Sequence, residues 1–507
     1  MVKKASKPAA KEKGKPKAKA KPAAAAKAKP PKAPAKQPLA WSTPAELSAA
    51  WNAAGRAHFL ALNPLLERLY NGEDVVLDPT DPRTEADGNA VIAQIVALNA
   101  AGEGERAREL FDPAFGPVFP WIKSERKQLR FVTILGPDEL LVVHGSPWLA
   151  DNVAYHLRGG TATAVPDVRC LARSRDRDLL IVGRAAGLAV YDARAGVAAL
   201  ARTPIAELAW PPPTLFMPRG LTAEEAAAWT PANEDLQLES MQVSDDGKRF
   251  VISCYRQGIL LGSLHAGDPP WQLLHPDARP PYRAADDTDV PRAGDMTHVA
   301  ISRDGKRLAW GSQDTPHYTA EITQGGEAAW YATIGPQSEY PHDACFSDDG
   351  RFVAFNSCHF YNGATVAFAW DGNRGAKLEP YAEHQAAPLI DGNLRVYASC
   401  WLPADVMSAV GDRPTTDGAF ALAGSGILRV VTRAGKLALV QGFGSSASSI
   451  DFCPEARRLA IGSYAGMVHV YDPDTAEQPG RIDGVRPRRE LARWCFWGGL
   501  PNGPIRW

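Results

Sequence analysis

The sequence has few cysteines and no paired cysteine motif. Seven Cys stand at positions 170, 254, 345, 358, 400, 453 and 495, and none belongs to a Cys-x-x-Cys pair. The odd count and the wide spacing argue against a disulfide framework and against a zinc ribbon. They indicate reduced, mostly buried thiols, and we expect a cytoplasmic protein.

Long hydrophobic runs are missing as well. No apolar stretch approaches the roughly 18 residues that a membrane-spanning helix requires, so we expect no membrane span. The basic N-terminus is not followed by an apolar stretch, which argues against a secretory signal. The sequence also lacks the Gly-x-Ser-x-Gly, phosphate-loop and His-Glu-x-x-His motifs, and we expect neither cofactor nor bound metal.

Lysine is scarce in most of the chain. Residues 1–40 hold 13 of the 19 Lys and one acid, Glu12, for a charge of +12, whereas residues 41–507 hold every Arg and carry −13. The net charge of −1 over 507 residues therefore hides two opposite parts. Such asymmetry points to a tail with its own partner.

The tail, residues 1–40, is built almost entirely of Lys, Ala and Pro. It has no aromatic residue and too little apolar surface to offset its ordering entropy, so we expect disorder. Its composition resembles the basic tails of linker histones. One hypothesis is non-specific binding of DNA or another polyanion through phosphates, and the other is a solubilising tether. The candidate polyanion contacts are Lys11, Lys13, Lys15, Lys17, Lys19 and Lys21.

Residues 41–115 predict a small helical subdomain. Thr43 precedes Pro44, and Glu46 follows three residues after Thr43, which is the pattern of a helix start. Apolar residues then recur at three- and four-residue spacing.

Beyond residue 126 the pattern changes to short strands, and four segments repeat one another. They read "MQVSDDGKRFVISC" from Met241, "HVAISRDGKRLAWG" from His298, "DACFSDDGRFVAFN" from Asp343 and "IDFCPEARRLAIGS" from Ile450. Each predicts two strands around a tight turn, and three contain the Asp-Gly pair that favours such turns. Repetition of a sheet-sized unit indicates an all-β fold of the propeller type.

Residues 448–472, "SSIDFCPEARRLAIGSYAGMVHVYD", resemble a blade of the WD-repeat β-propellers, with Tyr471-Asp472 in the place of the family's Trp-Asp pair. The Gly-His pair of that family is absent. We therefore expect an all-β, roughly seven-bladed propeller over 116–485, with blades starting near 128, 167, 238, 293, 338, 393 and 447. Residues 203–237 are predicted to be an insertion, and 486–507, rich in Trp, an extension docked on the body.

The resemblance to WD-repeat propellers implies where a ligand binds. In that family, ligands generally lie on the face formed by the starts of the first strands and the loops between the second and third strands. That places eight residues together as the candidate ligand or partner face: Tyr255, Arg256, His298, Asp314, His317, His342, Asp343 and His359. The alternative interpretation is that these His and Asp residues brace the blades by hydrogen bonds.

Three functions stay open. The favoured one is a non-enzymatic scaffold that holds a protein or peptide partner on the propeller face. The second is a propeller hydrolase, lactonase or metal enzyme that uses the His/Asp group. The third is a nucleic-acid-associated factor anchored by its tail. Fold alone does not decide among them.

Overall fold

The computed structural model describes most of the chain beyond residue 40. The described residues are 41–71, 73, 75–76, 80–113, 128–145, 152–216, 222–224, 236–254, 258–274, 297–312, 317–334, 341–357, 365–378, 388–390, 395–410, 417–478, 480–497 and 503–507. The predicted tail and its six candidate lysines lie outside these ranges.

Three helices come first: α1 (Pro44–Tyr70), α2 (Glu85–Ala100) and α3 (Gly104–Leu110). The Thr43 N–H donates to Glu46 Oε2 at 3.1 Å, and the Glu46 N–H donates to Thr43 Oγ1 at 3.2 Å. This reciprocal capping box satisfies two backbone donors that a helix start leaves without partners. The helix start predicted from these residues is therefore confirmed.

The remaining described chain is mostly β, in several antiparallel four-stranded sheets with a few short helices, which confirms the β character of the prediction. The first sheet holds β1 (Leu129–Gly136), β2 (Glu139–His144), β3 (Val153–Arg158) and β4 (Thr161–Val165). The second holds β5 (Cys170–Arg173), β6 (Leu179–Gly183), β7 (Gly187–Asp192) and β8 (Ala206–Ala209). The third holds β9 (Leu238–Val243), β10 (Arg249–Cys254), β11 (Gly258–Ser263) and β12 (Trp271–Leu274).

Two further sheets follow the same order. One holds β13 (His298–Ile301), β14 (Arg307–Gly311), β15 (His317–Ile322) and β16 (Ala328–Ile334), to which β20 (Lys377–Leu378) adds a short parallel pairing. The other holds β17 (Pro341–Phe346), β18 (Phe352–Ser357), β19 (Thr365–Ala369) and β21 (Pro388–Ile390). The short helices are η2 (Ala193–Ala201), η3 (Pro213–Phe216) and α6 (Ala404–Val410).

The largest sheet consists of two halves that share one long strand. Its members are β22 (Val396–Leu402), β23 (Ala419–Thr432), β24 (Leu437–Cys453), β25 (Arg458–Ser463), β26 (Met467–Ala476), β27 (Gly484–Val485), β28 (Arg488–Cys495) and β29 (Ile505–Arg506). The first part of β24 pairs with β23, and its last part, from Ala447 to Cys453, pairs with β25. A single strand thus completes one four-stranded set and begins the next.

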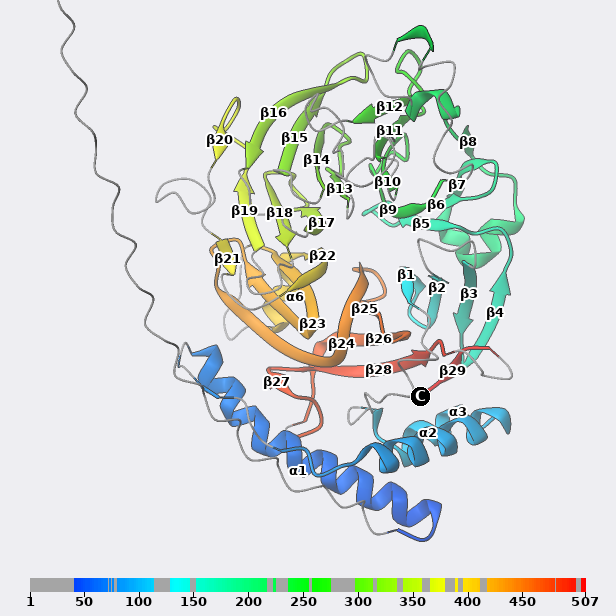
Figure 1. Cartoon of the computed structure of the whole chain (residues 1–507), viewed down its shortest axis with the longest axis vertical. Coiled ribbons are helices and arrows are strands. Elements are labelled where there is room, and N and C mark those ends of the chain that lie inside the picture. The colour runs from blue at the N-terminus through cyan, green and yellow to red at the C-terminus, as the bar shows by residue number, and fades with distance from the viewer. Residues whose placement is uncertain are drawn as a thin grey trace, which may run out of the picture. The chain divides into compact units, whose positions relative to one another are not determined.

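The first strand of each set lies toward the middle of Figure 1, and the later strands lie outside it. We call β1, β5, β9, β13, β17, β22 and residues 447–453 of β24 the inner strands. Each of them contacts the next in chain order, and β24 contacts β1. The strand starts predicted at 128, 167, 238, 293, 338, 393 and 447 lie within five residues of the observed starts.

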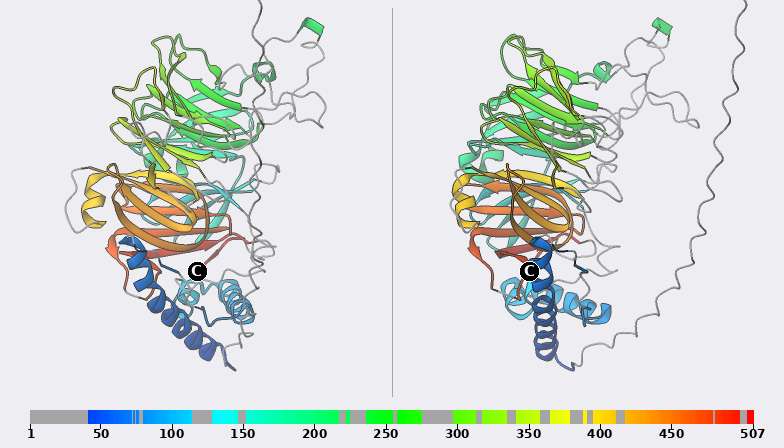
Figure 2. Two further views of the ribbon diagram at one scale, coloured as in Figure 1. Left: turned by 60° about the vertical axis from the view of Figure 1, so that its left-hand side comes forward. Right: turned by 90° about the vertical axis from the view of Figure 1, so that its left-hand side faces the viewer.

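The C-terminal segment belongs to a sheet and does not merely lie on one. β28 pairs with β26 along most of its length, and β29 pairs with β28. Trp507 is fully buried, and its Nε1–H donates to the carbonyl oxygen of Phe111 at 2.7 Å. Helices α1 to α3 pack beside these last strands, as Figures 1 and 2 show, and share a hydrophobic cluster with them. The chain end therefore joins the helices to the β-structure.

The segment predicted to be an insertion needs a correction. Residues Ala206–Ala209 form β8, which pairs with β7 from Gly187 to Val190 and completes the second sheet. The predicted insertion began at residue 203, before β8, because the prolines and the helical pattern that follow β8 dominated the interpretation of this segment. Residues 217–221 and 225–235 of this segment lie outside the described residues.

The repeated turns have one shared geometry. Ser174, Ser244, Ser302 and Ser347 each donate from Oγ to the Asp two residues later, at 2.5 to 2.6 Å. Each Oγ also accepts the backbone N–H of the residue five positions on, at 2.9 to 3.1 Å. In three turns the next position is glycine with φ of 64° to 67°, the left-handed region that favours glycine. The predicted role of the Asp-Gly pairs is confirmed.

The fourth turn has Arg177 where the others have glycine, with φ of 68°. Its guanidinium binds both carboxylate oxygens of Asp451, each at 2.8 Å, and donates to the carbonyl oxygen of Ile134 at 2.6 Å. The Ile134 N–H donates to Asp451 as well, at 2.8 Å. Arg177 therefore connects the second sheet to β1 and to β24, at the place where the last strand set contacts the first.

Candidate functional site

Half of the predicted ligand face lies outside the part of the chain that can be described. Tyr255, Arg256, Asp314 and His359 fall in undescribed segments, and for His342 only the backbone position in β17 is known. The described members of the predicted face are therefore His298, His317 and Asp343.

His298 of β13 and His317 of β15 form a buried pair. The Nε2 of His298 and the Nδ1 of His317 are 3.2 Å apart, and each residue is 1% exposed. The His317 ring stacks on Phe355, with centroids 4.6 Å apart, and burial lowers the pKa of His317 to about 3. The pair links two strands of one sheet, and the ring of His317 packs on Phe355 of the neighbouring sheet. Among the described residues, no group of three or more His, Cys, Asp or Glu side chains could hold a metal ion.

Asp343 of β17 bonds to the neighbouring inner strand. Its Oδ2 accepts hydrogen bonds from the Ser399 backbone N–H at 2.5 Å and from the Ser399 hydroxyl at 2.9 Å. The Asn356 amide donates to the same hydroxyl at 2.8 Å. Burial raises the pKa of Asp343 to about 7, although the bonds from Ser399 oppose that shift. The bracing interpretation thus fits the contacts of all three described residues.

A different feature marks the starts of the inner strands. In five of them the pairing register skips one residue, so that a β-bulge leaves this residue without a direct partner across the sheet. Bulges re-aim a side chain and are common next to functional sites. The bulge residues are Arg130, Glu239, His342, Tyr397 and Ser448.

Of these residues the sequence analysis had singled out only His342, yet the repeat contains a signal for others. Glu239, His342 and Ser448 each lie five residues before the turn Ser or Cys of their repeat. Thr297 has the same spacing, and its hydroxyl donates to Glu239 Oε2 at 2.7 Å. Counting back from the turn therefore locates the same position in successive sheets.

At the opposite ends of the inner strands, the turns are linked by charge. The residue after the turn serine alternates in sign from sheet to sheet: Arg175, Asp245, Arg303 and Asp348. Arg303 contacts Asp245 at 2.5 Å and Asp348 at 3.9 Å, and Arg175 contacts Asp348 at 3.3 Å. The Arg175 backbone N–H donates to Asp245 at 2.8 Å. These four residues form a closed circuit in which three links are ion pairs and the fourth is the backbone hydrogen bond from Arg175 to Asp245.

The starting ends are not satisfied in this way. Arg130 is 7% exposed, and its Nη2 has no hydrogen-bond partner among the described residues. The Ser448 hydroxyl, on the neighbouring inner strand, is likewise buried and unbonded within the described chain. Burial lowers the pKa of Arg130 to about 10, and the charge of Glu239 opposes that shift. A buried, still protonated guanidinium with a spare donor can bind an anionic group.

Comparisons with the models of known protein families and with curated proteins find no match for this chain. None of its described helices is both long enough and apolar enough to cross a membrane.

Proposed function

We propose that the chain is a β-propeller of roughly seven blades, similar to WD-repeat proteins, that acts as a non-enzymatic scaffold for a protein or peptide partner. Three observations support the architecture: the four-stranded antiparallel sets, the circular order of contacts among inner strands, and the recurring serine turn. Repeats that bury their faces only against neighbours are the rule in such folds.

The observation that carries the function is the contrast between the two ends of the inner strands. At the turn ends, Arg175, Asp245, Arg303 and Asp348 neutralise one another. At the starting ends, Arg130 keeps a buried donor that finds no partner among the described residues. A buried unsatisfied donor costs free energy, roughly 1–3 kcal/mol, and a ligand that supplies the acceptor recovers it. The partner is therefore expected to present a carboxylate at the starting ends.

The test uses peptides selected from a random library on the immobilised full chain. Selected peptides should carry an acidic side chain or a free C-terminal carboxylate. In fluorescence anisotropy, Arg130→Gln should weaken their binding by about tenfold or more, since a charge-assisted hydrogen bond is lost. Arg106→Gln, on an exposed position of α3, is the matched control and should bind as the unaltered chain does. Equal binding by a folded Arg130→Gln variant would refute the proposal.

A second candidate, a propeller hydrolase or lactonase, is favoured by one observation. The Asp343 carboxyl has a pKa near neutrality, raised to about 7 by burial, which suits proton transfer at physiological pH. Turnover of simple esters and lactones that disappears in Asp343→Asn would support it. Absence of turnover across that panel would leave the scaffold as the better proposal.

A further inference from the structure

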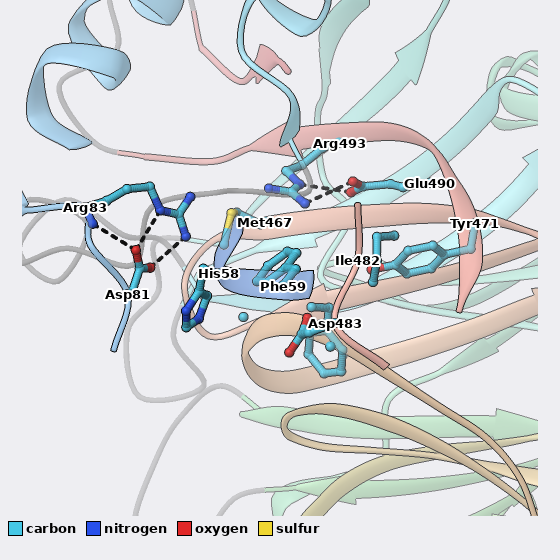
Figure 3. Close-up of a pocket in the computed structure, with 13 residues that line it drawn as sticks. His58, Phe59, Asp81, Arg83, Met467, Tyr471, Ile482, Asp483, Glu490 and Arg493 are labelled. Carbon is cyan, nitrogen blue, oxygen red and sulfur yellow. Dashed lines mark hydrogen bonds and ion pairs between the residues drawn. The ribbon is translucent and has the colours of Figure 1, made fainter. Parts of the chain in front are cut away.

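A cavity of about 160 Å³ lies between the helices and the last strands. Figure 3 shows the side chains around it, which come from α1, from the loop before α2, and from β24, β26, β28 and the turn before β27. The volume corresponds to about five water molecules, which suits a small ligand.

Both arginines of the cavity already have carboxylate partners. Arg83 binds Asp81 through Nε at 2.9 Å and Nη2 at 2.7 Å. Arg493 binds Glu490 through two nitrogens, each at 2.9 Å. Each guanidinium also lies over an indole ring: Arg83 is 4.5 Å from the ring centroid of Trp51, and Arg493 is 5.1 Å from that of Trp507. Because a carboxylate already neutralises each guanidinium, these arginines do not favour the binding of an additional anion.

Asp483 is the exception among the charged residues of the cavity. Within the described chain its carboxylate has no ion pair, although it lines the cavity beside Gly442 and Phe443. A Cβ atom at position 442 would lie only 2.0 Å from Asp483 Oδ1, so glycine is required for the carboxylate to keep its place. The Gly442 N–H also donates to the Asp483 carbonyl oxygen at 2.7 Å. The backbone therefore holds this carboxylate at the cavity wall.

The ionisation of Asp483 fits a cationic ligand. Burial raises the pKa of Asp483 to about 6, which leaves most of the carboxyl charged at pH 7. A charge kept in a desolvated position without a counterion is costly. A cation in the cavity would remove that cost.

Besides the two ion pairs and His58, the wall is mostly aromatic and apolar. It contains Phe59, Phe443, Tyr471, Met467 and Ile482, all of them buried. Aromatic faces beside a carboxylate that has no counterion are the chemistry by which proteins recognise ammonium groups, because the faces carry negative electrostatic potential. A metal ion is disfavoured, since hard cations require several oxygen ligands and the described residues offer no such cluster here.

We propose that this cavity binds a small organic ammonium ion, with Asp483 as its counterion and the Phe59, Phe443 and Tyr471 rings as its cage. The proposal does not depend on the scaffold function, since its residues are separate from Arg130 and the inner-strand starts.

The test is isothermal titration calorimetry on the full chain, with methylammonium chloride and tetramethylammonium chloride as probes. Saturable binding of at least one ammonium probe is expected, with none for sodium acetate at the same ionic strength. Asp483→Asn should weaken that binding by about tenfold or more. Asp138→Asn, at an exposed turn position, is the matched control and should leave it unchanged.

Phe443→Leu keeps an apolar wall but removes a ring, and should weaken binding by about threefold. This variant decides the question if Asp483→Asn does not fold. Arg130→Gln should bind ammonium normally, which separates this test from that of the scaffold function. The proposal is overturned if neither ammonium probe binds, if acetate binds instead, or if both cavity variants retain full affinity.

Discussion

Replacing Arg177 by glycine has two opposite effects on stability, the relief of backbone strain and the loss of an ion pair. The residue adopts φ of 68°, where the equivalent positions of three other turns are glycine. At the same time its guanidinium makes a two-point contact with Asp451, and their side chains are only 6% and 17% exposed. Glycine would relieve the backbone strain but remove the ion pair that joins the last strand set to the earlier ones.

The magnitudes decide the outcome. A non-glycine residue in the left-handed region costs roughly 1–2 kcal/mol. Removing one partner of a buried ion pair costs roughly 3–5 kcal/mol, because the other charge stays behind. Arg177→Gly should therefore lower the free energy of unfolding by roughly 1–4 kcal/mol. Arg177→Ala loses the pair and keeps the strain, so it should be less stable than the glycine variant by about 1 kcal/mol.

Urea unfolding followed by tryptophan fluorescence and by circular dichroism measures these differences. The order of stability should be unaltered chain, Arg177→Gly, then Arg177→Ala. Asp451→Asn tests the same pair from its other side, and combining it with Arg177→Gly should cost less than the sum of the two single changes. A glycine variant more stable than the unaltered chain would show that the strain outweighs the ion pair and that this reasoning is wrong.

Three further predictions concern titration and the tail. His317 has a folded pKa of about 3, below the ordinary value near 6.5, so only the unfolded chain gains a proton as pH falls below 6.5. Stability should fall by up to about 1.4 kcal/mol per pH unit in that range, and His317→Gln should flatten this acid dependence in urea titrations. The pH dependence that Asp483 contributes has the opposite sign, because its folded pKa of about 6 is above the ordinary value. The free-energy penalty of burying its charge is present above pH 6 and is relieved as the pH falls toward 4. Asp483→Asn should thus be more stable than the unaltered chain at pH 8 by roughly 1–3 kcal/mol and lose this advantage by pH 4, whereas equal stability at both pH values would contradict the assigned burial. Deleting residues 1–40 should abolish any salt-sensitive binding of duplex DNA, and a gel-shift titration that detects unchanged affinity would exclude the tail as the contact.

Local sequence patterns were sufficient for much of the fold. The cap at Thr43 and Glu46, the Asp-Gly turns and the strand starts each depend on residues close together in the chain. Turn chemistry and period-two alternation act over about ten residues, so they can be recognised before any tertiary contact is known.

The candidate site was harder to predict. The propeller resemblance placed His298 and His317 on one loop face, whereas the structure buries them as a hydrogen-bonded pair in the core. The function of Asp343 became clear only with Ser399, which is 56 residues away in the chain. Arg130 resembles any other strand arginine until the pairing register reveals its bulge.

The sequence by itself determined the β-rich repeat, its tight turns, the helical start and the separation of a basic tail from an acidic body. Only the tertiary structure decided which charges are neutralised and which are not. Arg177 is neutralised by Asp451, 274 residues later, while Arg130 keeps a free donor and Asp483 has no counterion within the described chain. The physical reason is that the free energy of a charge depends on burial and on neighbours from distant segments, and neither is encoded in local pattern.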